Sequence, residues 1–172
     1  VGVTALDAIA GGDQNTAVGY NALTSNTSGS YNQAFGINTL YSNTTGSYNT
    51  AYGGRALISN TSAQYNTALG YDALAANTTG SSNTATGTNA LNSNTTGVDN
   101  DAFGVNSMYS NTTGRNNLAL GSRALYSNTT GDYNIASGYK AGQLITTGSN
   151  NVIIGYEADP SANSASNQTV IG

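Results

Sequence analysis

The chain has no cysteine, no histidine and no tryptophan, and it has only one proline in 172 residues. The missing cysteine excludes a disulfide framework and a thiol nucleophile, and the missing histidine excludes an imidazole base. Metal sites built from histidine and cysteine are excluded as well. These absences favour a protein that is not an enzyme, and we predict no catalytic, cofactor-binding or metal-binding residue.

Charged residues are scarce, with four lysines and arginines against eight aspartates and glutamates. Four cations cannot form a basic stripe along a nucleic acid, and they disfavour an anionic membrane surface. No apolar run approaches the roughly 20 residues of a membrane span. Asp99 and Asp101, two apart on one expected strand face, fit solvated positions better than a catalytic pair. We expect no cofactor, no nucleic-acid partner and no membrane insertion.

The composition also disfavours an ordinary globular core, because 37% of the residues are hydrophobic and 22 are glycines. Disorder is disfavoured too, since the chain has twelve tyrosines and a net charge of only −4. A regular, repetitive and nearly uncharged structure fits this composition. The chain starts at Val1 without a signal peptide, so we expect it to be part of a longer protein.

A repeat of 17 residues runs through the whole chain, and it is marked by glycine. The register never slips between the following glycines: 2, 19, 36, 53, 70, 87, 104, 121, 138, 155 and 172. So short a unit cannot hold a helical hairpin, and its glycine, asparagine and threonine content disfavours helix. The unit must therefore consist of strands and turns.

We predict two short strands in each unit, one over "NTAVG" and one over "ALTS", with a tight turn at residues 19–21 and a return loop over "NTSGSY". Each unit then forms one coil of an all-β parallel β-solenoid, or β-roll, of about ten coils. At about 4.8 Å per coil, the rod is roughly 45–50 Å long. We divide the chain into solenoid repeats over 1–141 and divergent last coils with a C-terminal cap over 142–172, where the Ala-Leu pattern becomes Ala141-Gly142.

Stacking places identical repeat positions in rows along the rod. Alanines beginning at Ala17 and leucines beginning at Leu23 are predicted to fill the interior. Asparagines at one repeat position are predicted to form a ladder of side-chain hydrogen bonds, and Thr27 and its equivalents to extend that polar edge. The ladder residues are Asn26, Asn43, Asn60, Asn77, Asn94, Asn111 and Asn128.

The opposite face of the first strand is apolar, which a solvated face would not be. It carries Val18, Phe35, Tyr52, Leu69, Phe103 and Leu120, with Thr86 and Ser137 as exceptions. A thin solenoid has nothing of its own to cover such a stripe, so we predict that this face packs against copies of the same chain.

The core "N-x-A-x-G" resembles the head repeats of trimeric autotransporter adhesins of the YadA type. The longer unit "NTAxGYxALxSNTTGSxN" resembles repeats of phage and bacterial tail fibres, and "NNVIIGYEADPSANSASNQTVIG" resembles the stretch that ends them. The resemblance implies a left-handed parallel β-roll that forms an intertwined or side-by-side homotrimer. It also implies an extracellular protein, in a virion tail fibre or on a cell surface.

Three functions follow from these patterns. The first is a structural segment of a trimeric tail fibre or adhesin that supports host or surface attachment, with a cell-surface glycan or protein receptor as a further partner. The second is an ice-binding β-solenoid, which is disfavoured because adjacent threonines such as Thr44 and Thr45 point to opposite faces if the chain is extended. The third is a filament that polymerises end to end through its unpaired edges.

Three smaller patterns fit coil stacking without a ligand. Arg55 and Asp72 share a repeat position in adjacent coils, as do Lys140 and Glu157, so each pair is predicted to form an exposed ion pair. Tyrosines 31, 48 and 65 are predicted to stack, as are tyrosines 109 and 126. Seven of eight N-x-[ST] sequons fall at one repeat position, where Asn-Thr-Thr-Gly is good turn chemistry rather than a glycosylation signal.

Overall fold

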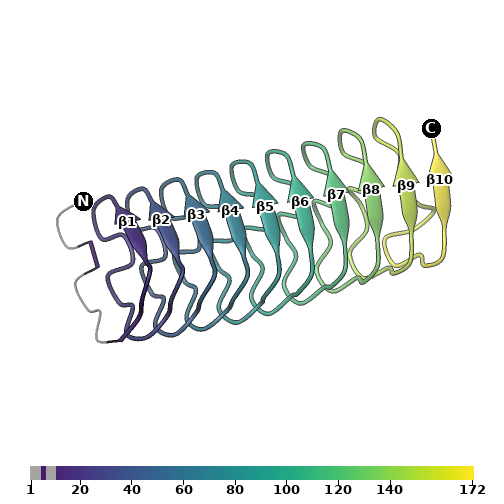
Figure 1. The fold of residues 1–172 in the computed structure, drawn as a ribbon. Coiled ribbons are helices and arrows are strands. Elements are labelled where there is room, and N and C mark those ends of the chain that lie inside the picture. Colours follow the sequence, from purple (N-terminus) through teal and green to yellow (C-terminus); the bar gives the residue numbers. More distant parts are fainter. Residues whose placement is uncertain (1–4, 7–10) are drawn as a thin grey trace.

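The computed structural model describes residues 5–6 and 11–172, and in these residues the chain forms a parallel β-solenoid without helices (Figure 1). Ten strands of three residues form one sheet in which each strand pairs with its neighbours in sequence. The strands are β1 (Thr16–Val18), β2 (Gln33–Phe35), β3 (Thr50–Tyr52), β4 (Thr67–Leu69), β5 (Thr84–Thr86), β6 (Asp101–Phe103), β7 (Leu118–Leu120), β8 (Ile135–Ser137), β9 (Val152–Ile154) and β10 (Thr169–Ile171). The predicted all-β solenoid is confirmed.

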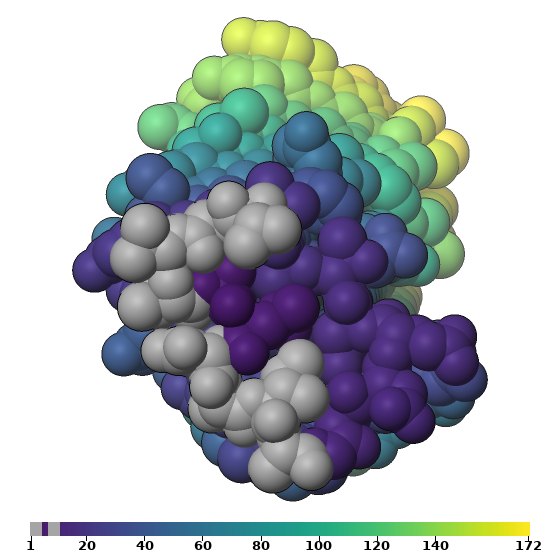
Figure 2. Space-filling model, turned by 60° about the vertical axis from the view of Figure 1, so that its left-hand side comes forward, coloured from purple at the N-terminus to yellow at the C-terminus, as the bar shows by residue number. Residues whose placement is uncertain are grey.

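Every coil lies in register with the next, so that Ala17 pairs with Ala34 and the same offset holds through β10. The backbone hydrogen bonds are not confined to the strands. Leu23 donates its N–H to the carbonyl of Thr39 (2.9 Å), and Thr27 donates to Thr44 (2.9 Å). Each coil is therefore bonded to its neighbour around much of its circumference, and Figure 2 shows the coils following one another along the rod.

The predicted second strand over "ALTS" is wrong, because this segment is a turn. Leu23 has a φ of 54°, and its equivalents Leu40 and Leu57 have 50° and 52°. Ala22 and Leu23 are adjacent, yet both are fully buried. Adjacent residues of an extended strand point to opposite faces, so only a turn can place both of them inside the coil.

The predicted turn after the first strand is present, with left-handed backbone at Gly19 (φ 137°) and Asn21 (φ 54°). Glycine is required at the first of these positions. A Cβ on Gly19 would lie 2.3 Å from the carbonyl oxygen of Gly36 in the next coil, which is closer than any real contact. The close stacking of these turns explains why glycine marks the 17-residue repeat.

The interior holds the predicted alanine and leucine rows, which are fully buried from Ala34 to Ala136 and from Leu23 to Leu125. The coil that contains β8 exchanges two residues of this pattern. Gly142 stands where the coils before it have leucine or Met108, and the buried Ile145 stands where they have the ladder asparagine. A Cβ on Gly142 would lie 3.4 Å from the Cδ1 of Ile145, so the isoleucine occupies the space that the missing leucine leaves.

The predicted asparagine ladder is confirmed, and its side chains lie in the core rather than at a polar edge. We call it the Asn26 ladder; it comprises the seven asparagines from Asn26 to Asn128, all fully buried. Each Nδ2 donates to the Oδ1 of the preceding coil at 2.7–3.1 Å. It also donates to the carbonyl three residues later, as Asn26 does to Gly29 (2.9 Å). The amide thus satisfies both its own groups and a turn carbonyl inside the core.

A second buried ladder was missed by the sequence reasoning. We call it the Asn15 ladder, and it contains Asn15, Asn32, Asn49, Asn66, Asn83, Asn100, Asn117, Asn134 and Asn151. From Asn15 to Asn134, each Oδ1 accepts the backbone N–H of the next asparagine in the row at 2.9–3.2 Å, and Oδ1 of Asn151 accepts that of Gln168 at 3.0 Å. The Nδ2 of Asn32 donates to the carbonyl of Gly46 (2.8 Å), which also accepts from Asn43 of the first ladder (3.0 Å). One asparagine from each ladder therefore donates to the same turn carbonyl.

The sheet continues across residue 142 through β9 and β10, although the last coil departs from the repeat. In other coils the position of Leu144 donates to a backbone carbonyl, as Ser25 does to Tyr41. Here the Leu144 N–H donates to Oδ1 of Asp159 at 3.0 Å. A carboxylate thus replaces the backbone acceptor in the coil that contains Pro160.

We predict that Asn77→Ala lowers the free energy of unfolding by roughly 2–5 kcal/mol, because it leaves Oδ1 of Asn60 and one amide hydrogen of Asn94 buried without partners. The matched control is Asn92→Ala, which removes one half-buried hydrogen bond at a position where the preceding coil already has Ala75. Its cost should be about 1 kcal/mol or less. Chemical unfolding of the two variants measures the difference, and equal stability would show that the ladder does not stabilise the core.

Candidate functional site

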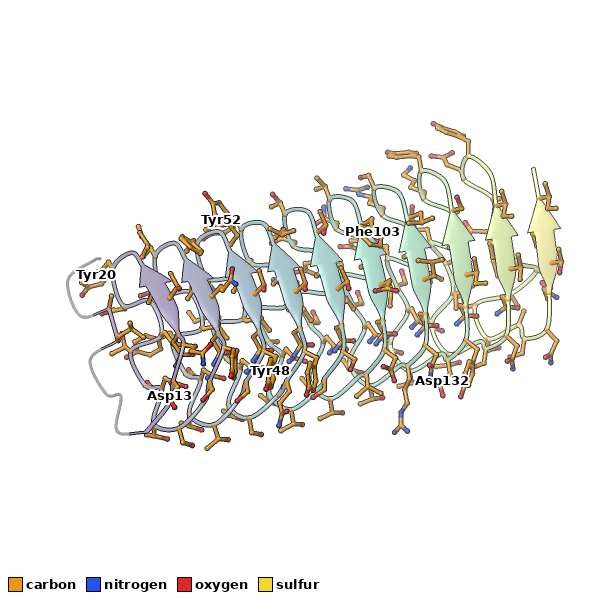
Figure 3. All side chains as sticks on the ribbon, in the orientation of Figure 1. Asp13, Tyr20, Tyr48, Tyr52, Phe103 and Asp132 are labelled. Carbon is orange, nitrogen blue, oxygen red and sulfur yellow. The ribbon has the colours of Figure 1, made fainter. Side chains whose placement is uncertain are left out.

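The strand side chains on either side of the buried alanine row point out of the coil. The apolar row beginning at Val18, which we call the outer stripe, is exposed in the single chain. Ile171 in β10 is 74% exposed, and six further large members are 39–59% exposed: Val18, Tyr52, Leu69, Phe103, Leu120 and Ile154. Phe35 is half-buried because Tyr52 stacks on it, with the ring centroids 5.4 Å apart. The predicted face therefore exists along the sheet, with interruptions at Thr86 and Ser137; Tyr52 and Phe103 of this row are labelled in Figure 3.

A second outward row lies two residues earlier in each strand. The sequence reasoning did not include its apolar residues in the predicted contact face. It is polar from Thr16 to Asp101 and then becomes apolar at Leu118, Ile135 and Val152. The signal was present in the sequence, because residues two apart in a strand share a face. The outer stripe is consequently one residue wide over most of the rod and two residues wide at its C-terminal end.

Asp99 and Asp101 do not share a strand face, which corrects the sequence expectation. Asp101 begins β6, whereas Asp99 lies before the strand in left-handed backbone (φ 54°). Within the described residues there is also no group of three acidic residues that could hold a metal ion.

The predicted tyrosine stacks are present on the surface. Tyr31, Tyr48 and Tyr65 stack with centroid separations of 4.9 and 5.0 Å and interplanar angles of 5° and 7°. Tyr109 and Tyr126 stack at 5.3 Å, and Arg123 lies 5.8 Å from the Tyr126 ring. In Figure 3, Tyr48 and Tyr52 lie at opposite ends of β3, so the first stack is separate from the outer stripe.

The asparagines of the repeated sequons are the Asn26 ladder itself, so their amide nitrogens lie inside the folded rod. The eighth, Asn167, is exposed. The two threonine rows that follow the ladder both reach the surface, since this segment is bent rather than extended. The argument that adjacent threonines such as Thr44 and Thr45 point to opposite faces is therefore wrong. Thr44 donates its hydroxyl to the carbonyl of Thr61 (3.0 Å), and this bond recurs along its row.

Both predicted ion pairs between coils are present. Arg55 Nε lies 3.0 Å from Asp72 Oδ1, and Lys140 Nζ lies 2.6 Å from Glu157 Oε1. The hydrogen bond to Glu157 raises the pKa of Lys140 above its ordinary value. Arg55 and Glu157 are exposed, whereas the Asp72 side chain is mostly buried beneath its partner. Pairs with an exposed partner are screened by solvent and add little to stability.

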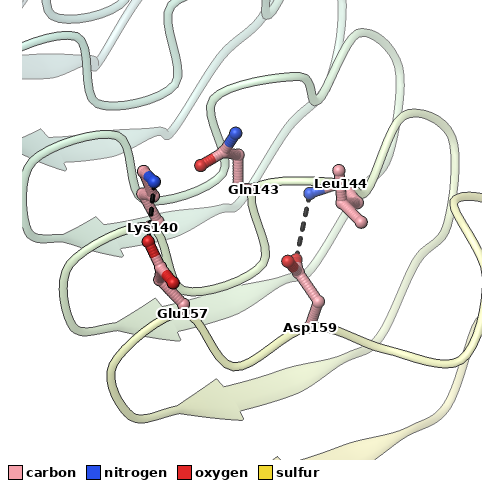
Figure 4. Close-up of a pocket in the computed structure, with 5 residues that line it drawn as sticks. All are labelled: Lys140, Gln143, Leu144, Glu157 and Asp159. Carbon is pink, nitrogen blue, oxygen red and sulfur yellow. Dashed lines mark hydrogen bonds and ion pairs between the residues drawn. The ribbon is translucent and has the colours of Figure 1, made fainter.

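An open depression of about 250 Å³ lies beside the second ion pair, lined by Lys140, Gln143, Leu144, Glu157 and Asp159 (Figure 4). Lys140 and Glu157 bond to each other, and Asp159 accepts the backbone N–H of Leu144. Partial burial raises the pKa of Asp159, and the nearby Glu157 adds to this effect. Its three charged groups therefore bond between adjacent coils, which favours a structural role for the depression.

No family model, no curated protein and no solved structure matches this chain. Among the described residues, no helix is long and apolar enough to cross a membrane. The surface rows of the solenoid are thus the features on which a function can be argued, and the outer stripe is the apolar row that lies on the strands.

We predict that Asp159→Asn protects the Leu144 amide from hydrogen exchange at neutral pH. The raised pKa means that the folded state favours the protonated acid, so the stabilising contribution is present at low pH and is lost as pH rises through the folded pKa. Asparagine keeps an acceptor for Leu144 without the charge. Amide exchange at pH 7 and near pH 3 measures this, with Asp132→Asn as a surface control. A difference between Asp159→Asn and wild type that is as large at low pH as at neutral pH would contradict the prediction.

Proposed function

We propose that this chain is a structural segment of an extracellular fibre, a tail fibre or surface adhesin, in which parallel copies form a homotrimer through the outer stripe. The observation that carries the proposal is the exposed apolar row along the outward face of the sheet. Exposed apolar side chains also lie just after the strands, as at Tyr20, Ile37 and Val105, but that row is interrupted by Gly54, Thr88 and Ser122. The outer stripe differs from it in lying on the strands of the sheet itself.

The apolar area supports self-association. Burying a fully exposed large apolar side chain contributes about 1.5–3 kcal/mol, and the stripe side chains are already about half-buried, so each contributes roughly half of that in a contact. The stripe side chains together supply a gain of the same order as the cost of association. The widening of the stripe at Leu118, Ile135 and Val152 adds to this area. Long apolar rows of this kind mark contact surfaces in soluble proteins.

Copies of the same chain are the partner that fits best. A neighbouring rod has the same 17-residue spacing, so its stripe matches this one coil for coil over ten strands. A partner with another repeat length would lose register within a few coils. The number three comes from the resemblance to trimeric adhesins and tail fibres, and it places host or surface attachment in the role of the assembled fibre.

Ice binding is the second candidate, favoured by the two adjacent threonine rows at the surface. The row containing Thr78 is fixed by hydroxyl bonds to the next coil (3.1 Å), and the row containing Thr79 is exposed. A thermal hysteresis measurement separates the two functions. The fibre proposal predicts none, whereas ice binding predicts hysteresis that Thr79→Tyr abolishes.

We predict that Phe35→Asp with Leu69→Asp reduces the particle to the mass of one chain, because it places charge in the apolar contact. Both side chains point out of the coil, so the core and the asparagine ladders remain intact. The matched control is Ile37→Asp with Tyr71→Asp, which changes exposed apolar residues of the same two coils away from the strands.

Sedimentation gives the mass, and circular dichroism confirms that each variant is folded. A folded double variant with the mass of the wild type would overturn the proposed interface. A wild-type particle of two chains would retain self-association and exclude the trimer, and wild-type filaments that lengthen with time would favour end-to-end polymerisation.

A further inference from the structure

The surface row that contains the first tyrosine stack has a missing ring. We call it the tyrosine row, and its members are Gln14, Tyr31, Tyr48, Tyr65, Ser82, Asp99, Asn116, Tyr133, Asn150 and Asn167. All ten have left-handed backbone with φ between 54° and 60°. Their side chains therefore leave the backbone from equivalent positions, one in each coil.

In this row, the spacing between successive coils matches the separation between stacked aromatic rings. The rings of Tyr31, Tyr48 and Tyr65 follow one another at 4.9 and 5.0 Å and are nearly parallel. The next member is Ser82, whose side chain is much smaller than a ring. The stack thus stops at Tyr65, and the row carries no ring at Ser82, between Tyr65 and Asp99. We call this ring-free position of the row the gap.

The two walls of this gap differ in chemistry. One wall is the second face of the Tyr65 ring, which stacks on no described aromatic residue. Tyr65 is 58% exposed, against 44% for Tyr31 and 47% for Tyr48. The other wall is Asp99, two coils further on, or about 9–10 Å along the rod. The exposed Asp99 carboxylate forms no hydrogen bond or ion pair with the described residues.

We propose that this gap, bounded by Tyr65 and Asp99 and floored by Ser82, binds a neutral hexopyranose ring of a glycan. A pyranose is one ring thick, and its C–H face packs on an aromatic ring as apolar surface does. The sugar hydroxyls donate to the Asp99 carboxylate, which is the stronger kind of hydrogen bond because the acceptor is charged. The negative charge of Asp99 disfavours acidic sugars.

The Ser82 hydroxyl supplies a further polar group at the base of the gap. The rings of the stack give the site its rigidity, since Tyr65 is held against Tyr48 before any sugar arrives. The gap lies within one chain and apart from the outer stripe. Sugar binding therefore does not depend on the proposed trimer. A negative result for either proposal does not contradict the other.

The test is saturation-transfer NMR of the folded chain with the methyl β-glycosides of glucose, galactose and mannose at millimolar concentrations. We expect transfer to the ring C–H protons of at least one sugar. Tyr65→Ala should weaken its binding roughly tenfold by removing the stacking face. Asp99→Asn should weaken it by a similar factor, because the charged acceptor is lost.

The sharpest variant is Ser82→Tyr, which fills the gap with a fourth ring. The row already accepts tyrosine at this backbone conformation, so the variant should fold and extend the stack. It should abolish sugar binding. The matched control is Asn150→Tyr, which adds a ring to the same row beside Tyr133 and leaves the gap open, so binding should persist.

Retention of binding in Ser82→Tyr would overturn the proposal, as would wild-type affinity in Tyr65→Ala. Absence of transfer to all three sugars would overturn it as well. Sedimentation of the same samples reports the particle mass, so the outcome for the gap is read separately from the outcome for the assembly.

Discussion

The fold depends on the requirement that every buried amide meets an equivalent amide in the next coil. An asparagine in a core is costly unless both its donor and its acceptor groups are bonded. Asn43 meets this condition through Asn26, Asn60 and the carbonyl of Gly46. One inserted residue would move a different side chain into the row and break two such bonds. The fixed 17-residue length is thus enforced by the polar part of the core, while the alanine and leucine rows supply its apolar area.

Much of the stacking could be predicted from the sequence, because residues 17 apart occupy equivalent positions in adjacent coils. The Asn26 ladder, the alanine row, the ion pairs and the tyrosine stacks all follow from counting in steps of 17. The errors arose within the coil, where the repeat gives no information. Ala22 and Leu23 look like part of a strand, and only their joint burial shows that the backbone turns at the leucine.

The surfaces were harder to predict than the core for a related reason. The Asn15 ladder precedes each strand and was counted as part of it, although its side chains turn inward to the carbonyls of the return loop. The threonine rows were assigned opposite directions by a rule that holds only for extended chain. Where the backbone is irregular, side-chain direction depends on φ at single residues, which the composition of a turn does not determine.

The described surface divides into rows with different properties, and the solenoid keeps them apart along the rod. The outer stripe lies on the strands, the tyrosine row before them, a further row with Ile37 and Tyr71 after them, and the threonine hydroxyl groups on the return loop. A contact through one row therefore leaves the others accessible. This separation is what allows an assembly surface and a sugar-binding gap to exist in coils only 17 residues long.

The Asn26 ladder also gives the rod an electrical direction. Every amide points its Nδ2 toward the preceding coil and its Oδ1 toward the following one, and the last oxygen, on Asn128, has no partner. Each amide has a dipole of about 3.5 D, and aligned dipoles add along the axis. The N-terminal end of the ladder is thus its positive pole and the C-terminal end its negative pole. Parallel neighbours place like poles together, which is unfavourable, so a parallel arrangement has to be imposed by the shape and apolar area of the contact face.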